Sequence, residues 1–152
     1  MISNILILLK KLFKTFATQD KLAEEIAHPS FGGKKKKLKP GLAIILANNN
    51  PASRIYVNNK IKAALRVGID AKLFEFSKDE KEKCLKTIKR LDADPGVHGI
   101  IVQYPVYNGW NFDQFEQAIT PQKDVDGFRE DSLFSGATAL GVWEMLTAFA
   151  LL

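Results

Sequence analysis

The sequence has few of the residues that build cross-linked or metal-bound cores, with one cysteine and two histidines in 152 residues. A single cysteine cannot form an internal disulfide, and structural zinc sites need four Cys or His ligands. The disulfide-rich and zinc-finger classes are therefore excluded, and no metal is expected. Cys84 lies in a helical pattern near Lys83 and Lys86 with no histidine close by, so we expect it to pack rather than to act as a nucleophile.

A membrane-spanning run is also missing near the N-terminus, because the apolar stretch at residues 5–9 is too short to cross a bilayer. Lys10, Lys11 and Lys14 follow this stretch, whereas a signal peptide carries its positive charges before the apolar part. We expect an amphipathic helix that covers the domain, with loose contact to a membrane surface as the alternative. No stable membrane insertion is expected, and the single thiol suits a cytoplasmic protein.

Acidic residues are outnumbered, with 17 Asp and Glu against 22 Lys and Arg, which gives a net charge of +5. Part of the excess lies in the lysine run at residues 34–37. Runs of this kind are more often solvated segments than nucleic-acid sites, so we expect no nucleic-acid partner. A basic interaction module that binds nucleic acid through this run is the alternative.

From residue 38 onward, the hydrophobic pattern alternates between that of strands and that of helices. Strand-like apolar runs occupy residues 41–47, 70–76 and 97–102. Helical spacing is seen at residues 51–67, 78–91 and 112–119, and a last helix is expected from about Leu140 onward. This alternation predicts an α/β fold, a three-layer αβα arrangement with a mostly parallel sheet.

Local signals set several boundaries of these elements. Asn50 before Pro51 predicts an N-cap with proline in the first helical turn, and Gly68 predicts the end of that helix. Residues 1–37 are less regular, because a helical stretch is followed by Pro29, two glycines and the four lysines. We therefore divide the chain into a divergent N-terminal helix and basic loop at residues 1–37 and a domain at residues 38–152.

Three polar residues are expected at the carboxyl edge of the sheet, where open α/β sheets bind their ligands. Tyr56 and Lys60 are four residues apart, so their side chains share one face of the first helix. Gln103 follows the third strand, and its amide could reach the same place. A lysine in a partly closed pocket can exchange protons near neutral pH, because loss of hydration favours its neutral form.

The motif Lys123-Asp124-Val125-Asp126-Gly127 places two carboxylates two residues apart before a glycine. The other ligand positions of a cation-binding loop are missing, so a metal is not expected here. If one acid bonds the backbone to hold the turn, the other is free to accept hydrogen bonds from the amino and ring N–H groups of a ligand.

Taken together, these stretches resemble one family. Residues 38–45 (LKPGLAII) and 50–60 (NPASRIYVNNK), followed by 94–105 (DPGVHGIIVQYP) and 121–128 (PQKDVDGF), are similar to the bifunctional methylenetetrahydrofolate dehydrogenase/methenyltetrahydrofolate cyclohydrolase enzymes. The motifs occur in the family's order and at suitable spacing, and the resemblance covers about residues 38–146. It implies that the chain is a folate-binding catalytic domain, with the amino-acid-dehydrogenase-like fold of the family's N-terminal domain.

The resemblance also implies roles for individual residues. Lys60 would be the general acid/base, and Gln103 would be its hydrogen-bond partner. Tyr56 would pack on the aromatic body of the folate, and Ser53 would line the cleft near the start of the helix. Asp126 would bind the pterin, whereas Asp124 would hold the loop.

In the family, hydride passes from methylenetetrahydrofolate to NADP, and water then opens the methenyl product to formyltetrahydrofolate. No Gly-rich phosphate loop is present in this sequence, so we expect no cofactor site here, with NADP bound by a C-terminal Rossmann domain that is absent. The resemblance implies a homodimer in the full-length form. Residues 137–141 (ATALG) stand where the family has a Cys-Thr-Pro-Leu-Gly-like step.

Two kinds of function remain open from the sequence. The first is an enzyme domain, inactive alone, that holds the folate half of the cleft. The alternative is a non-catalytic folate-binding module, which would keep Tyr56 and Asp126 but would need neither Lys60 nor Gln103. All four residues are present, which favours the enzyme.

Overall fold

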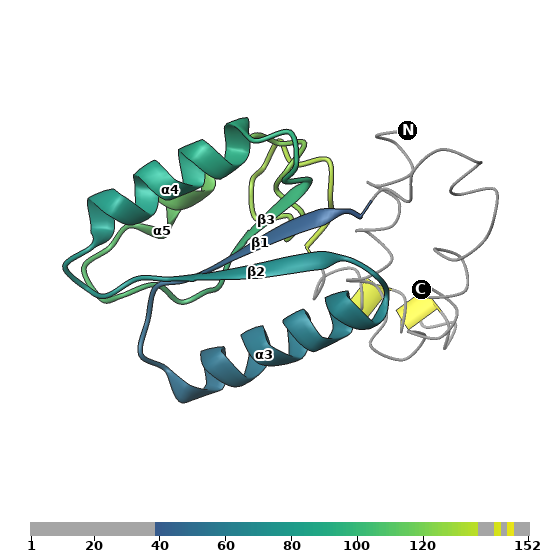
Figure 1. Ribbon diagram of the computed structural model, residues 1–152, viewed down its shortest axis with the longest axis horizontal. Coiled ribbons are helices and arrows are strands. Elements are labelled where there is room, and N and C mark those ends of the chain that lie inside the picture. Colours follow the sequence, from purple (N-terminus) through teal and green to yellow (C-terminus); the bar gives the residue numbers. More distant parts are fainter. Residues whose placement is uncertain (1–38, 137–141, 144–145, 148–152) are drawn as a thin grey trace.

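The computed structural model describes residues 39–136, 142–143 and 146–147. The elements of this part alternate in the order β1 (Gly41–Leu46), α3 (Pro51–Arg66), β2 (Asp70–Glu75), α4 (Lys81–Ala93), β3 (Gly99–Val102) and α5 (Phe112–Glu116). The strands form a parallel sheet in the order β2–β1–β3, so β1 is central. Helix α3 covers one face of the sheet, and α4 and α5 cover the other (Figure 1). The predicted three-layer αβα fold is confirmed.

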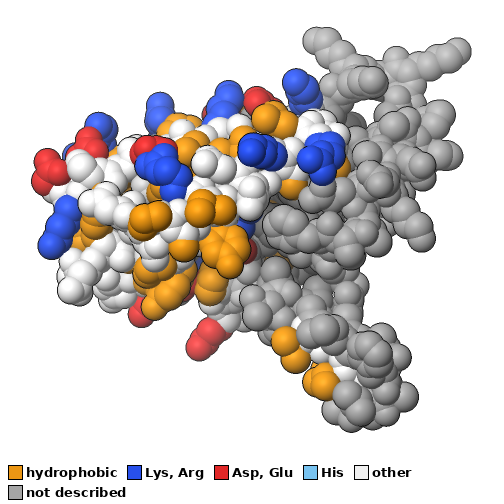
Figure 2. All heavy atoms as spheres, turned by 90° about the horizontal axis from the view of Figure 1, so that it is seen from below, with side chains coloured by type: hydrophobic (Ala, Val, Ile, Leu, Met, Phe, Trp, Pro, Cys, Tyr) orange, Lys and Arg blue, Asp and Glu red, His pale blue; other side chains and the backbone are white. Residues whose placement is uncertain are grey.

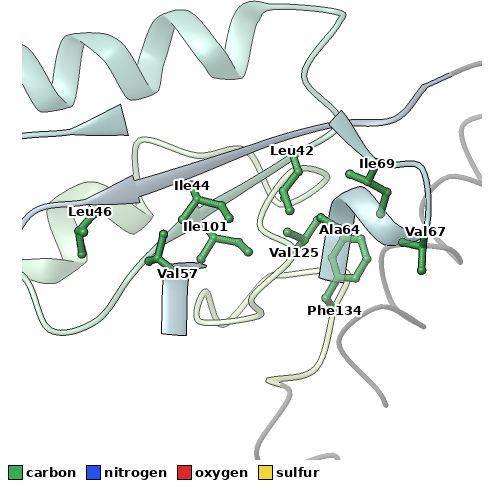
Figure 3. Packing of buried hydrophobic residues seen from close by; sticks show 10 residues of the cluster. All are labelled: Leu42, Ile44, Leu46, Val57, Ala64, Val67, Ile69, Ile101, Val125 and Phe134. Carbon is green, nitrogen blue, oxygen red and sulfur yellow. The ribbon is translucent and has the colours of Figure 1, made fainter. Parts of the chain in front are cut away.

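Strands β1 and β3 bury both of their faces, as their apolar runs predict, whereas the border strand β2 is only partly buried. Alternate residues of β1 point to opposite sides, and Leu42, Ile44 and Leu46 lie on the side of α3. Figure 3 shows the cluster that they build with residues of α3, β3 and the segment after α5. Its other members are Val57, Ala64, Val67, Ile69, Ile101, Val125 and Phe134.

On the opposite face, Ala43 and Ile45 pack under α4 and α5 with Ile88 and Phe115. Cys84 of α4 is fully buried in this cluster, and burial raises the pKa of its thiol to about 12. The thiol is therefore protonated at neutral pH, and the packing role expected for Cys84 is confirmed.

Helix α3 begins and ends where its local signals predict. The side chain of Asn50 accepts a hydrogen bond from the backbone N–H of Ala52, which satisfies one of the free amides of the first turn. Gly68 follows the last turn with a φ of 82°, a conformation that glycine adopts without the steric cost of a Cβ atom.

Helix α4 begins at Lys81, three residues after the predicted start. The reason is a turn in front of it, in which the Glu80 carboxylate accepts hydrogen bonds from both the N–H and the hydroxyl of Ser77. Strand β3 is also shorter than predicted and begins at Gly99. Before it, His98 accepts a hydrogen bond from the backbone N–H of Gly41, which is a structural contact.

The short helix predicted at residues 112–119 ends at Glu116. Of the last predicted helix, residues 142–143 and 146–147 are helical, and the rest lies outside the described residues, as do residues 1–38 and 137–141. Within the part of the chain that is described, no helix has the length and apolar character needed to cross a bilayer.

Candidate functional site

The candidate site lies where the connections from β1 and β3 diverge. The chain leaves β1 through α3 toward β2 and returns through α4 to β3 on the other side of β1. Parallel sheets bind ligands at such a point, beyond the carboxyl ends of the two strands. Two further segments carry the site, the Gln103 loop (residues 103–111) and the Asp126 loop (residues 120–129).

Lys60 and Asp126 come together at this edge. The Lys60 ammonium on α3 lies 3.7 Å from Oδ2 of Asp126, and the two side chains are only 20% and 14% exposed. The pair joins α3 to the Asp126 loop. An ion pair that is largely shielded from water interacts more strongly than one at the surface.

The pKa of Asp126 is raised above its ordinary range, and burial is the main cause. The neighbouring Asp124 raises the pKa further, whereas Lys60 lowers it through its charge and a hydrogen bond. The ionised carboxylate of Asp126 therefore depends on the Lys60 cation. A ligand that donates N–H groups to this carboxylate would likewise favour its ionised form.

Asp124 is buried and bonds the backbone of its own loop. Its two carboxylate oxygens accept hydrogen bonds from the N–H groups of Gly127 at 3.1 Å and Arg129 at 3.0 Å. Gly127 has a φ of 70°, and a Cβ atom there would lie 2.7 Å from the carbonyl oxygen of Phe134. The sharp turn after Asp126 thus requires both the acid and the glycine.

Lys123 fastens the same loop to the end of α4. Its ammonium donates to the carbonyl oxygens of Asp92 at 2.6 Å, Asp94 at 2.8 Å and Leu91 at 3.4 Å. A cation at this place satisfies the free carbonyls of the last helical turn and complements the helix dipole. The loop is also joined to the sheet, because the N–H of Ile100 in β3 donates to the carbonyl of Lys123 at 2.8 Å.

Gln103 stands at the end of β3, with its N–H bonded to the carbonyl of Ile45 in β1. Its side-chain Nε2 donates to the carbonyl of Tyr104 at 2.8 Å. Its Oε1 atom is buried and has no hydrogen-bond partner within the described residues. The expected Gln103–Lys60 hydrogen bond stays a prediction, and Oε1 is the acceptor that could receive it.

The two other predicted residues lie on α3 and differ in exposure. Tyr56 is 62% exposed, so its ring is available to a flat ligand. Ser53 is buried in the first turn of the helix. Seen from the side of α3, hydrophobic side chains lie among lysines and arginines on the surface (Figure 2).

The sequence analysis missed a row of aromatic side chains beside the site. Tyr104 contacts Phe112 edge-on at 5.1 Å, and Phe112 contacts Phe128 edge-on at 5.4 Å. Tyr104 and Phe128 directly follow Gln103 and the Asp126-Gly127 pair, and both are more than half exposed. The sequence signal that could have found Tyr104 and Phe128 is their position directly after the polar residues of the two motifs.

Glu116 was also missed. Burial raises its pKa from an ordinary 4.5 to about 6, and the nearby carboxylates of Asp124, Asp113 and Asp126 add to the shift, which Arg129 opposes. The Asp126 loop is thus bordered by a second acid that titrates close to neutral pH. In the described ranges, no three His, Cys, Asp or Glu side chains gather as a metal site would require.

Comparison with known proteins places these motifs in one family. The model of the tetrahydrofolate dehydrogenase/cyclohydrolase catalytic domain matches residues 13–126, which includes part of the segment before residue 38. The bifunctional protein FolD of Nitrosomonas eutropha is 40% identical over 124 residues, covering 75% of this chain and 42% of that protein. The chain therefore spans less than half the length of this relative.

Solved structures of bifunctional dehydrogenase/cyclohydrolases are also similar to this chain. The bifunctional FolD methylenetetrahydrofolate dehydrogenase/cyclohydrolase of Campylobacter jejuni has a TM-score of 0.75 and 32% identity, over 91% of this chain and 53% of its own. The dehydrogenase-cyclohydrolase of Trypanosoma brucei, solved with NADP cofactor and an inhibitor, has a TM-score of 0.78 and 25% identity, over 93% and 50%. With its catalytic-domain match and its site motifs in order, the chain belongs to the tetrahydrofolate dehydrogenase/cyclohydrolase family.

Proposed function

We propose that this chain supplies the folate-binding and proton-transfer half of an enzyme that oxidises 5,10-methylenetetrahydrofolate and hydrolyses the methenyl product to 10-formyltetrahydrofolate. The observation that carries the proposal is the shielded Lys60–Asp126 pair at 3.7 Å, at the sheet edge where Gln103 also ends its strand. A structural ion pair would need neither the orphaned Oε1 atom of Gln103 nor an exposed tyrosine on the same helix.

In this proposal, Asp126 binds the pterin. Its carboxylate is shielded and lies at the turn that Asp124 and Gly127 hold, so it can accept hydrogen bonds from amino and ring N–H groups in one fixed direction. Tyr56 packs on the aromatic body of the folate, and the buried hydroxyl of Ser53 borders the pocket at the start of α3.

Lys60 is the proton-transfer group of the proposal. When the pterin occupies Asp126, the Lys60 ammonium is released from part of that ion pair, and Oε1 of Gln103 becomes its acceptor. The amine can then give a proton to, or take one from, the water and the one-carbon unit in the hydrolytic step. Gln103 holds the amine in place, because its other amide atom is fixed on the carbonyl of Tyr104.

NADP accepts the hydride of the oxidative step when it is bound. The described residues do not fit this cofactor, because the turn after β1 is Asn48-Asn49-Asn50-Pro51, whereas dinucleotide folds have closely spaced glycines there. We place the NADP site outside this chain's described part. Family membership further supports a homodimer in the longer form, and the single free thiol supports a cytoplasmic location.

Two variants test the proposal. Lys60→Met should lower methenyltetrahydrofolate hydrolysis at least about 100-fold, since it removes the proton-transfer group. Folate should still bind, because the N–H groups of the pterin can favour the ionised Asp126 carboxylate in place of Lys60. Asp126→Ala should weaken binding about tenfold to 100-fold, the effect of losing a charge-assisted hydrogen bond. Binding is measured by calorimetry on the 152-residue chain, and hydrolysis is measured on the chain joined to the remaining part of the Nitrosomonas eutropha relative.

The control is Lys62→Met, which removes an exposed lysine from the same helix. It should change neither quantity. Full hydrolysis by Lys60→Met would remove Lys60 from catalysis, and unchanged affinity in Asp126→Ala would contradict the pterin site. Folate binding with no hydrolysis in any form of the chain would favour the non-catalytic folate-binding module instead.

A further inference from the structure

Asn48, which has no part in the predicted site, bonds two segments that meet at the sheet edge. It follows β1 and is largely buried, at 9% exposure. Its Oδ1 accepts a hydrogen bond from the N–H of Asn50 at 2.9 Å, and its Nδ2 donates to the carbonyl of Pro105. One side chain therefore connects the N-cap of α3 with the Gln103 loop.

These bonds continue to the side chain of Gln103. Pro105 and Tyr104 are the two residues after Gln103, and Nε2 of Gln103 is bonded to the Tyr104 carbonyl. Both carbonyls of this short segment are thus held by side-chain amides, one from Asn48 and one from Gln103 itself. The orientation of Gln103 depends on where the segment lies, and Asn48 sets that position against α3.

A second bond acts in parallel. The hydroxyl of Tyr107 donates to Oδ1 of Asn49 at 2.8 Å, so the neighbouring asparagine holds the same loop at a second point. The ring of Tyr107 contacts Trp110 edge-on, and Trp110 stacks on the buried Phe115. The loop is anchored on α5 by rings and on the β1–α3 turn by asparagines.

From this connected path we propose that Asn48 is a positioning residue, which fixes Gln103 relative to Lys60 by tying the Gln103 loop to the helix that carries the lysine. The inference rests on the proposed function for its effect on turnover, but the positioning itself can be observed without activity. Asn48 touches no reacting group and acts only through Gln103.

The test uses two matched substitutions in the 152-residue chain. Asn48→Asp keeps the oxygen that accepts from Asn50 but removes the donor to Pro105. Asn111→Asp is the control, because the Asn111 side chain likewise accepts a backbone N–H two residues on, at 3.0 Å from Asp113. In a nitrogen–proton correlation spectrum, the side-chain amide signals of Gln103 should move in Asn48→Asp and stay in place in Asn111→Asp.

Turnover, measured on the chain joined to the remaining part of the Nitrosomonas eutropha relative, gives the second readout. Asn48→Asp should lower hydrolysis about tenfold, the effect of losing one hydrogen bond that is made within the protein, with the folate affinity unchanged. In a Gln103→Ala background the same substitution should have little further effect, because the residue through which it acts is gone. Tyr107→Phe, which keeps the ring but removes the hydroxyl, should lower hydrolysis by a smaller factor. This variant tests the same role if Asn48→Asp does not fold.

The outcomes separate the two proposals. Gln103 signals that do not move in either Asn48→Asp or Tyr107→Phe would overturn the positioning role whatever the activity. Full additivity of Asn48→Asp and Gln103→Ala would also overturn it. If the unaltered chain, joined to the remaining part of the Nitrosomonas eutropha relative, hydrolyses nothing, the proposed function fails, and the spectra alone still decide whether Asn48 positions Gln103.

Discussion

The two loops of the site are held by different kinds of interaction. The Gln103 loop is held by neutral amides and stacked rings, through Asn48, Asn49 and the contacts of Tyr107 with Trp110. The Asp126 loop is held by charges, through the carboxylate of Asp124 and the ammonium of Lys123. The difference teaches that the half of the site held by neutral groups should be insensitive to pH, whereas the half bordered by Glu116, with its pKa of about 6, should respond to it.

The largest expected effect comes from Asp124→Ala. The substitution leaves the partly buried N–H groups of Gly127 and Arg129 without their charged acceptor, which should lower the free energy of unfolding by about 3 kcal/mol in urea titrations. Asp131→Ala is the control, since that exposed carboxylate only pairs with Arg129 at the surface and its loss should have a much smaller effect. Equal losses in the two variants would show that Asp124 does not hold the loop.

Trp110→Ala should produce the next largest loss, about 2 kcal/mol, because it removes a partly buried ring that stacks on Phe115 and leaves a gap that the surroundings fill only in part. Since no charge is involved, the loss should be the same at pH 5 and pH 8. A loss that differs between pH 5 and pH 8 would show that charged groups also hold the Gln103 loop.

Lys123→Met should lower the free energy of unfolding by about 1.5 kcal/mol, since it withdraws the ammonium from three carbonyl acceptors and keeps the length of the side chain. Lys89→Met, on the exposed side of α4, should stay within about 0.5 kcal/mol of the unaltered protein. Similar values for both lysines would mean that the carbonyls are satisfied by water when Lys123 is absent.

The smallest effect, and the sharpest for the comparison, is that of Glu116→Gln. The folded protein binds a proton at Glu116 with a pKa of about 6 against an ordinary 4.5, so the free energy of unfolding should fall as the pH rises from about 4.5 to 6. The glutamine variant should lack this fall and be the more stable protein at pH 7. Unfolding titrations across this range would contradict the shift if both proteins have parallel profiles.

How far the sequence predicts this molecule depends on how local each signal is. The ends of α3 are confirmed because Asn50 and Gly68 act within a few residues. The burial of both faces of β1 is confirmed because its apolar run is continuous. The start of α4 was wrong by three residues, since a glutamate that bonds back to Ser77 competes with the helix.

For the site, too, the success of a prediction depends on how local its signal is. The pairing of Lys60 with Asp126 joins two motifs to which the family resemblance gave roles toward the same folate. The contacts of Asn48 and Lys123 were not predicted, because each reaches a backbone carbonyl about 30 or more residues away in sequence, and carbonyls carry no sequence signal. The raised pKa of Glu116 depends on packing that only the folded chain defines.

The bond from the N–H of Ile100 to the carbonyl of Lys123 has a consequence for solubility. Strand β3 is a border of the sheet in the described part of the chain, and the Asp126 loop occupies a position along it through the bridge between Ile100 and Asp124. Unpaired strand borders recruit strands from other molecules. Substitutions that loosen the Asp126 loop should therefore promote aggregation, because they leave this border of the sheet open to pairing with another molecule.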